Sequence, residues 1–112
     1  MPAQTKGNQT EFHQMESYKP RAQEEKILIK ALASAKSEEE VANFLRDLLT
    51  PNEISEMANR VQIASLLLSQ KYSYLDIAGI AKTSTTTVTR VAHWLFNGCG
   101  GYYTLLKRAL NK

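Results

Sequence analysis

The chain has 112 residues, a net charge of +3, 43% hydrophobic residues and a single cysteine, Cys99. This length predicts one domain with a modest core, which is small for an enzyme with a deep cleft. One cysteine excludes an intrachain disulfide and favours the reducing cytoplasm, and we find no apolar run of membrane-spanning length and no signal-peptide pattern.

The charge is unevenly distributed along the chain. Residues 1–59 contain seven basic and ten acidic side chains, a net charge of −3. Residues 60–112 contain seven basic side chains and one acidic side chain, Asp76, a net charge of +6. A basic half is typical of a protein that binds a polyanion such as nucleic acid, and an acidic half would avoid it.

The first part of the chain is polar and then becomes helical. Residues 1–19 show little apolar periodicity, and we interpret them as a flexible N-terminal arm. Pro20 suits the first turn of a helix, and the apolar spacing that follows predicts a helix over about residues 21–35. A second helix is expected after Ser37, which has a glutamate three residues later as in a capping box. These patterns predict a helical domain over residues 20–112.

The clearest helix start in the chain is Thr50-Pro51-Asn52-Glu53. It combines an N-cap residue, a proline at the first helical position and a glutamate that can accept a hydrogen bond from the cap. The helix should continue to about Gln70, and Ile63 and Leu66 widen its apolar surface beyond one stripe. Such a helix must be covered on more than one side. In so small a chain, a second copy is one source of that cover.

Residues 73–96 predict a helix-turn-helix. Ser73 can cap a short helix, and Ser84 can cap a second helix after a three-residue turn. Apolar residues at steps of three, four and seven predict the buried face of the second helix: Val88, Val91, Ala92 and Leu95. The opposite face carries three hydroxyl groups and an imidazole: Thr85, Thr86, Thr89 and His93.

The threonine-rich run has a second interpretation. Six of the seven residues 83–89 are Ser or Thr, and β-branched residues favour strands over helices. A half-buried strand should alternate between polar and apolar residues, however, and residues 91–96 do not. We therefore favour a helix, in which hydroxyl and methyl groups would suit contact with phosphates and thymine methyl groups.

The chain ends in a glycine-rich turn and a last helix. In residues 97–101, Gly98 is expected in the left-handed conformation that ends many helices. Residues 102–110 predict a final amphipathic helix. The sequence as a whole predicts an all-α fold of six helices, without strands, connected by loops of two to five residues.

No combination of residues predicts catalysis or a metal site. His93 and Cys99 lie six residues apart and provide too few ligands for a structural zinc ion. Ser73 and Asp76 are explained by helix capping. We therefore expect no enzyme, no metal and no cofactor.

Three elements resemble the Trp repressor family: Leu49-Thr50-Pro51-Asn52-Glu53, Asn59-Arg60-Val61-Gln62-Ile63 and Thr87-Val88-Thr89-Arg90. Residues 84–91 are more similar still to the Trp repressor-like YerC/YecD group, and the resemblance covers about residues 45–97. It implies a six-helix Trp repressor-like fold and an intertwined homodimer, in which two helix-turn-helix heads read a pseudo-palindromic operator.

The predicted DNA contacts lie on the second helix of the helix-turn-helix, in the turn that precedes this helix, and just before the motif begins. Leu75 and Ala78 replace residues that are basic in the Trp repressor, so the operator sequence cannot be transferred. The predicted DNA-binding residues are Lys71, Lys82, Ser84, Thr85, Thr86, Thr87, Thr89 and His93.

The resemblance also implies an effector pocket. In the Trp repressor two arginines, which correspond to Arg60 and Arg90, sandwich the bound tryptophan; the pocket here would contain Thr50, Arg60, Arg90, Val91 and Trp94. Val91 and Trp94 replace smaller residues, and overpacking of this kind costs roughly 1–3 kcal/mol. We therefore expect that free tryptophan is not the ligand. Trp94 either stacks between the two arginines or is an ordinary core aromatic.

These patterns together predict a cytoplasmic regulator of transcription, a repressor that binds specific double-stranded DNA as a homodimer. The alternative is a helical protein–protein interaction module that does not bind DNA.

Overall fold

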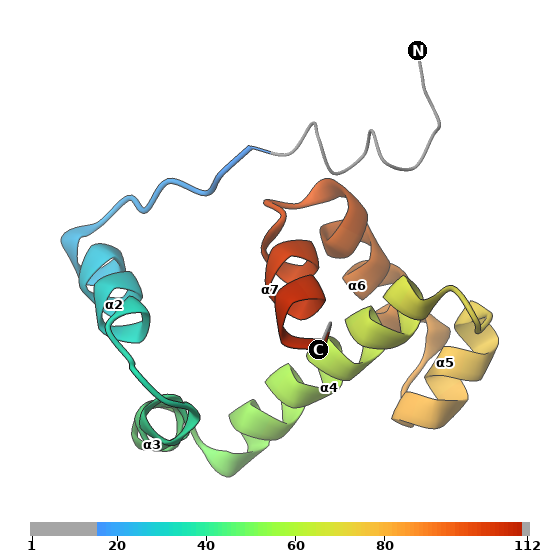
Figure 1. Ribbon diagram of the computed structural model, residues 1–112. Helices are drawn as coiled ribbons and strands as arrows, with labels where there is room; N and C mark the ends of the chain where they lie inside the picture. The colour runs from blue at the N-terminus through green and yellow to red at the C-terminus, as the bar shows by residue number, and fades with distance from the viewer. Residues whose placement is uncertain (1–15, 111–112) are drawn as a thin grey trace. The chain divides into compact units, whose positions relative to one another are not determined.

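Six α-helices make up the computed structural model of the chain, which describes residues 16–110 (Figure 1). The helices are α2 (Gln23–Ala33), α3 (Glu38–Leu48), α4 (Pro51–Ser69), α5 (Tyr74–Ala81), α6 (Thr85–Asn97) and α7 (Gly101–Leu110). The predicted all-α fold is confirmed, and no strand occurs in this range. The strand interpretation of residues 83–89 is wrong, since α6 begins at Thr85. Most of the predicted arm, residues 1–15, lies outside the described range.

Hydroxyl side chains begin the helices where the sequence predicts them. At the start of α4 the capping is reciprocal: the Glu53 N–H donates to Thr50 Oγ1 at 3.1 Å, and the Thr50 N–H donates to the Glu53 carboxylate at 2.9 Å. Ser37 caps α3 and Ser73 caps α5, each accepting from a backbone N–H three residues later, at 3.1 and 3.0 Å. An N-cap of this kind stabilises a helix by about 1 kcal/mol.

The start of α2 differs from the prediction. The helix begins three residues after Pro20, and its N-cap, Ala22, has no side chain that can accept a hydrogen bond. Glu25 satisfies the polar groups there instead, because its carboxylate accepts from the Tyr18 hydroxyl at 2.7 Å and the Arg21 N–H at 3.2 Å. Both hydrogen bonds lower the pKa of Glu25, and the one from Tyr18 has the larger effect.

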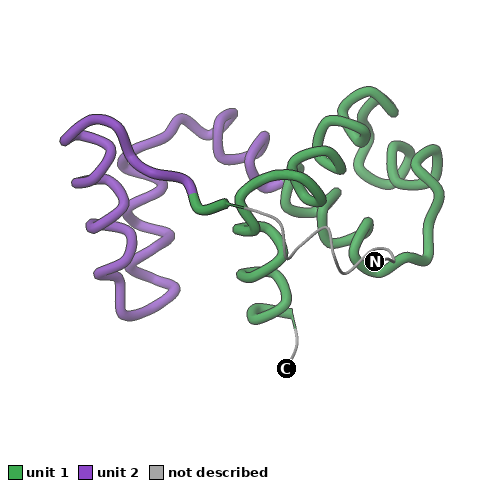
Figure 2. The backbone as a smooth tube through the Cα atoms, turned by 90° about the horizontal axis from the view of Figure 1, so that it is seen from above, with its two compact units in different colours: residues 1–17, 59–112 green, residues 18–58 purple. Residues whose placement is uncertain are grey.

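Contacts divide the chain into two compact units, and α4 runs through the boundary between them (Figure 2). Residues 18–58 form one unit, which contains α2, α3 and the first turns of α4. None of these residues is buried within a single chain. Several large apolar side chains of this unit are exposed: Ile27, Leu28, Ile29, Leu32, Leu48 and Met57.

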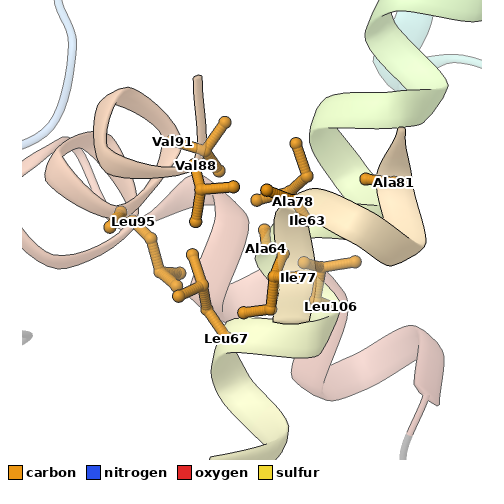
Figure 3. Packing of buried hydrophobic residues seen from close by; sticks show 11 residues of the cluster. Ile63, Ala64, Leu67, Ile77, Ala78, Ala81, Val88, Val91, Leu95 and Leu106 are labelled. Atoms are coloured by element: carbon orange, nitrogen blue, oxygen red, sulfur yellow. The ribbon is translucent and has the colours of Figure 1, made fainter. Parts of the chain in front are cut away.

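The other unit, whose described part is residues 16–17 and 59–110, contains the hydrophobic core. Side chains from α4, α5, α6 and α7 meet there (Figure 3). Ile63, Ile77, Val88 and Leu95 are fully buried, and full burial of such a side chain is worth about 1.5–3 kcal/mol. The predicted buried face of α6 is confirmed, with Val88, Val91, Ala92 and Leu95 all in the core.

The end of α6 corrects the prediction for Gly98. The φ of Gly98 is −90°, which is not left-handed. In the turn between α6 and α7, the glycine with a positive φ is Gly100, at 86°. Gly98 is buried instead against the last turn of α6, where a Cβ would overlap the backbone carbonyl of Trp94. The absence of a side chain allows a close approach here and is not needed for a special backbone conformation.

Candidate nucleic-acid interface

The helix-turn-helix consists of α5, the turn 82–84 and α6, and the two helices pack directly on each other. Lys82 ends α5 in the left-handed conformation, with φ 57° and ψ 51°. Its N–H donates to the Gly79 carbonyl at 3.3 Å, and the Thr83 N–H donates to the Ala78 carbonyl at 2.9 Å. This pair of hydrogen bonds is a Schellman motif, in which glycine is the usual left-handed residue. A lysine therefore occupies a position that favours glycine, and its side chain is exposed at the turn.

The start of α6 separates the predicted DNA-binding residues into two groups. Ser84 Oγ accepts from the Thr87 N–H at 3.2 Å and lies 3.2 Å from Thr87 Oγ1, so both hydroxyl groups are used in capping. Thr87 is also half-buried, whereas Thr85, Thr86 and Thr89 are exposed. The capping pair positions the helix, and the exposed threonines are the ones available to a ligand.

The N-terminus of α6 lacks the acidic residues that neutralise the preceding helices. Helices α2 to α5 each carry at least one carboxylate in the first turn, whereas α6 has none. The partial positive charge of the helix N-terminus is therefore not compensated by a carboxylate in that turn. Such an end attracts anions, phosphate groups included.

An open hollow of about 410 Å³ lies on the exposed face of α6. The described residues that line it are Thr86, Thr89, Arg90 and His93. All four are exposed and lie away from the face that packs in the core. The His93 ring meets the Trp94 ring edge-on, with centroids 5.4 Å apart. The family resemblance placed Arg90 in an effector pocket, although its spacing of four residues from Thr86 and three from His93 already indicated the same face.

The residues of the predicted effector pocket have different environments. Val91 is 4% exposed and belongs to the core, whereas Arg60 and Arg90 are exposed. Thr50 lies in the unit of residues 18–58 and caps α4. Thr50 belongs to one unit and the other four residues belong to the other, so the effector site stays a prediction.

Both interpretations of Trp94 are wrong for the single chain. Its side chain is 56% exposed, so it is not a core aromatic. Within residues 16–110 the cation–π contact is that of Lys107 Nζ over the Tyr103 ring, at 5.7 Å, and no arginine stacks on Trp94. The reason is its position on α6: the core residues are Val91 and Leu95, and Trp94 points to one side of that stripe.

The chain has a small helical core that presents one polar helix, α6, whose first turn carries no acidic residue. Helix-turn-helix proteins present their second helix in this way, and that helix enters the DNA major groove. The family model of the Trp repressor protein matches residues 23–110, and the chain belongs to the Trp repressor family. Within it, the chain falls in the Trp repressor-like YerC group.

Two relatives support this assignment. The chain is 34% identical over 94 residues to the "Uncharacterized protein YerC" of Bacillus subtilis (strain 168), which covers 84% of this chain and 89% of that protein. The structure resembles the crystal structure of a TrpR-like protein from Eubacterium eligens ATCC 27750, with a TM-score of 0.73 and 34% identity. That match covers 80% of this chain and 91% of the other. The resemblance seen in the sequence is confirmed, and the Trp repressor-like fold with it. No helix in the described range is long and apolar enough to cross a membrane.

Proposed function

We propose that the protein is a cytoplasmic regulator of transcription, a repressor that binds specific double-stranded DNA through α6. The observation that carries this proposal is the two-sided character of α6. Its apolar side is fixed in the core, and its other side presents threonine hydroxyl groups, Arg90 and His93 beside an N-terminus without acidic residues. Membership of the Trp repressor family supports the same function.

The contacts can be divided by chemistry. Thr85 and Thr86 occupy the first turn of α6, the part of a recognition helix that reaches base edges in the major groove. Lys82 and Lys71 are exposed before α6 and would bind the phosphate backbone. The threonines should therefore determine which sequence is bound, and the lysines should contribute affinity for any sequence.

The protein would act as a homodimer. The unit of residues 18–58 has no buried residue, although α2 exposes Ile27, Leu28, Ile29 and Leu32. A second chain packed on these side chains would supply the missing core, and residues 20–112 would then act as one domain. A two-fold dimer would place two copies of α6 in successive major grooves, about 34–36 Å apart.

A selection of bound sequences from a random duplex pool tests the proposal. We expect a pseudo-palindromic site, a changed site preference for Thr86→Ala and a uniform loss of affinity for Lys82→Ala. If both variants weaken all sequences equally, the threonines do not read bases. If the wild-type protein binds no duplex even at low salt, the protein is instead an interaction module, for which the exposed Leu75 and Ile80 of α5 would be the docking surface.

Tryptophan should not be required for DNA binding. Val91 is part of the core and takes up space that a smaller residue would leave for an indole. We expect thermal melting to be the same with and without tryptophan. A saturable rise of the melting temperature with tryptophan concentration would show that a pocket for it exists.

A further inference from the structure

We propose that the hollow on α6 binds one phosphate group of the DNA backbone, held by Arg90 and His93 together with the Thr89 hydroxyl. This inference rests on the proposed DNA-binding function and extends it. It moves Arg90 from the effector pocket to the DNA-binding face, and it makes DNA affinity depend on the protonation of His93.

The first argument is the state of Arg90. Its side chain is exposed on α6 and lines the hollow, and within residues 16–110 it has no hydrogen bond or ion pair with another protein group. A guanidinium group offers five N–H donors in a planar fork that matches two phosphate oxygens. An unpartnered arginine that faces a hollow lined by hydroxyl groups is therefore suited to an anion.

The second argument is the helical spacing of the lining residues. Thr89 precedes Arg90 directly, Thr86 lies one turn before it, and His93 lies one turn after it. Side chains at such spacing share one face of a helix. The hollow thus extends the exposed threonine face from the first turn, which is proposed to read bases, into the middle of α6. At that point a recognition helix lies beyond the base edges and close to the DNA backbone.

The third argument is the charge around His93. No acidic residue occurs on α6, and Asp76 on α5 is the one acidic side chain of residues 59–110. The other charged groups on α7 and on the part of α4 that belongs to this unit are basic: Arg60 on α4, and Lys107 and Arg108 on α7. Within residues 16–110, no hydrogen bond or ion pair joins His93 to a carboxylate, so this position is open to a phosphate group. Protonation adds a positive charge and a second N–H donor to an imidazole, so a bound phosphate should be held more tightly as the pH falls.

The salt dependence of binding to a short mixed-sequence duplex tests the role of Arg90. Affinity is measured by fluorescence anisotropy between about 50 and 200 mM salt, where log K falls by about 0.9 per phosphate contact for each tenfold rise in salt. Arg90→Ala should reduce this slope by about 0.9 per subunit. Arg90→Lys should keep the slope, because an ammonium group still neutralises the phosphate. Lys36→Ala, which removes an exposed cation between α2 and α3, is the matched control and should leave the slope unchanged.

The pH dependence of binding tests the role of His93. We expect wild-type affinity for the same duplex to rise between about pH 8 and pH 6, and His93→Gln to abolish that rise. A rise in affinity that persists in His93→Gln would assign the pH dependence to another group and overturn the role of His93.

Inorganic phosphate, added at constant ionic strength, should not displace the duplex saturably. Saturable displacement would show that the hollow also accepts free phosphate, and its assignment to the DNA backbone alone would be wrong.

The results separate failure of this inference from failure of the proposed function. If the wild-type protein does not bind the duplex, the DNA-binding function itself is wrong. If it binds but Arg90→Ala keeps the wild-type salt slope, only the phosphate site is wrong, and Arg90 returns to the effector pocket. Melting temperatures of all variants establish that they are folded, and Arg90→Gln replaces Arg90→Ala if the alanine variant is unstable.

Discussion

Replacement of Lys82 by glycine should make the protein more stable and its DNA binding weaker. Lys82 has φ 57° and ψ 51°, and the left-handed conformation costs a residue with a side chain about 1–2 kcal/mol. Glycine removes that cost, but its greater freedom in the unfolded chain offsets roughly 0.5–1 kcal/mol of the gain. The net expectation for Lys82→Gly is a stabilisation of about 0.5–1 kcal/mol, or roughly 2–8 °C in melting temperature.

The same substitution removes a cation from the turn before α6. We expect the salt slope of duplex binding to fall by about 0.9 per subunit, as for the loss of one phosphate contact. Gln70 provides the matched control, because it is the other non-glycine residue with a positive φ, 60°, among residues 16–110, and it is uncharged. Gln70→Gly should raise the melting temperature similarly and leave the salt slope unchanged.

Two results would refute this reasoning. A lower melting temperature for Lys82→Gly would mean that the lysine side chain makes a stabilising contact that outweighs its backbone conformation. An unchanged salt slope would mean that Lys82 does not reach DNA, and the left-handed lysine would then have no functional explanation.

Three further predictions concern glycines and a titrating carboxylate. Gly98→Ala should destabilise the protein by about 1–3 kcal/mol in chemical denaturation, because the added Cβ would overlap the Trp94 carbonyl. Gly79→Ala, in the middle of α5 with open space around it, should instead stabilise by about 0.5–1 kcal/mol, and a loss of stability would show an unseen contact. The lowered pKa of Glu25 stabilises the fold at neutral pH, and this contribution is lost as the pH falls through that pKa. Tyr18→Phe removes its main cause and should raise the pKa of Glu25 in an NMR titration, whereas an unchanged pKa would exclude the Tyr18 hydrogen bond in solution.

Much of the fold could be predicted because local signals agreed with one another. Thr50 and Glu53 satisfy each other's backbone N–H groups, so a four-residue pattern was enough to locate the start of α4. The buried residues of α6 follow one helical stripe, and this periodicity correctly outweighed the strand propensity of its threonines. Where spacing and capping coincide, sequence is a good guide to structure.

The errors arose where a residue's role depends on tertiary contacts. Gly98 was expected to adopt a left-handed conformation, but the structure needs a glycine there because the chain folds back closely on Trp94. Trp94 was expected either to stack between two arginines or to be a core aromatic, yet one step around the helix from Leu95 is enough to expose it. Arg90 was assigned by resemblance, although its spacing from Thr86 and His93 already placed it on the exposed face of α6. For the close approach at Gly98, neither composition nor periodicity contains the information.

The exposed apolar side chains of α2 and α3 have a consequence for the amount of protein a cell must make. In the proposed dimer these helices complete their packing only when two chains meet, so mass action ties the folded fraction to copy number. Dilution would then lower the melting temperature. At low expression the proposed regulator would lose occupancy of an operator more steeply than in proportion to its abundance, and a gene under its control would then respond with a threshold.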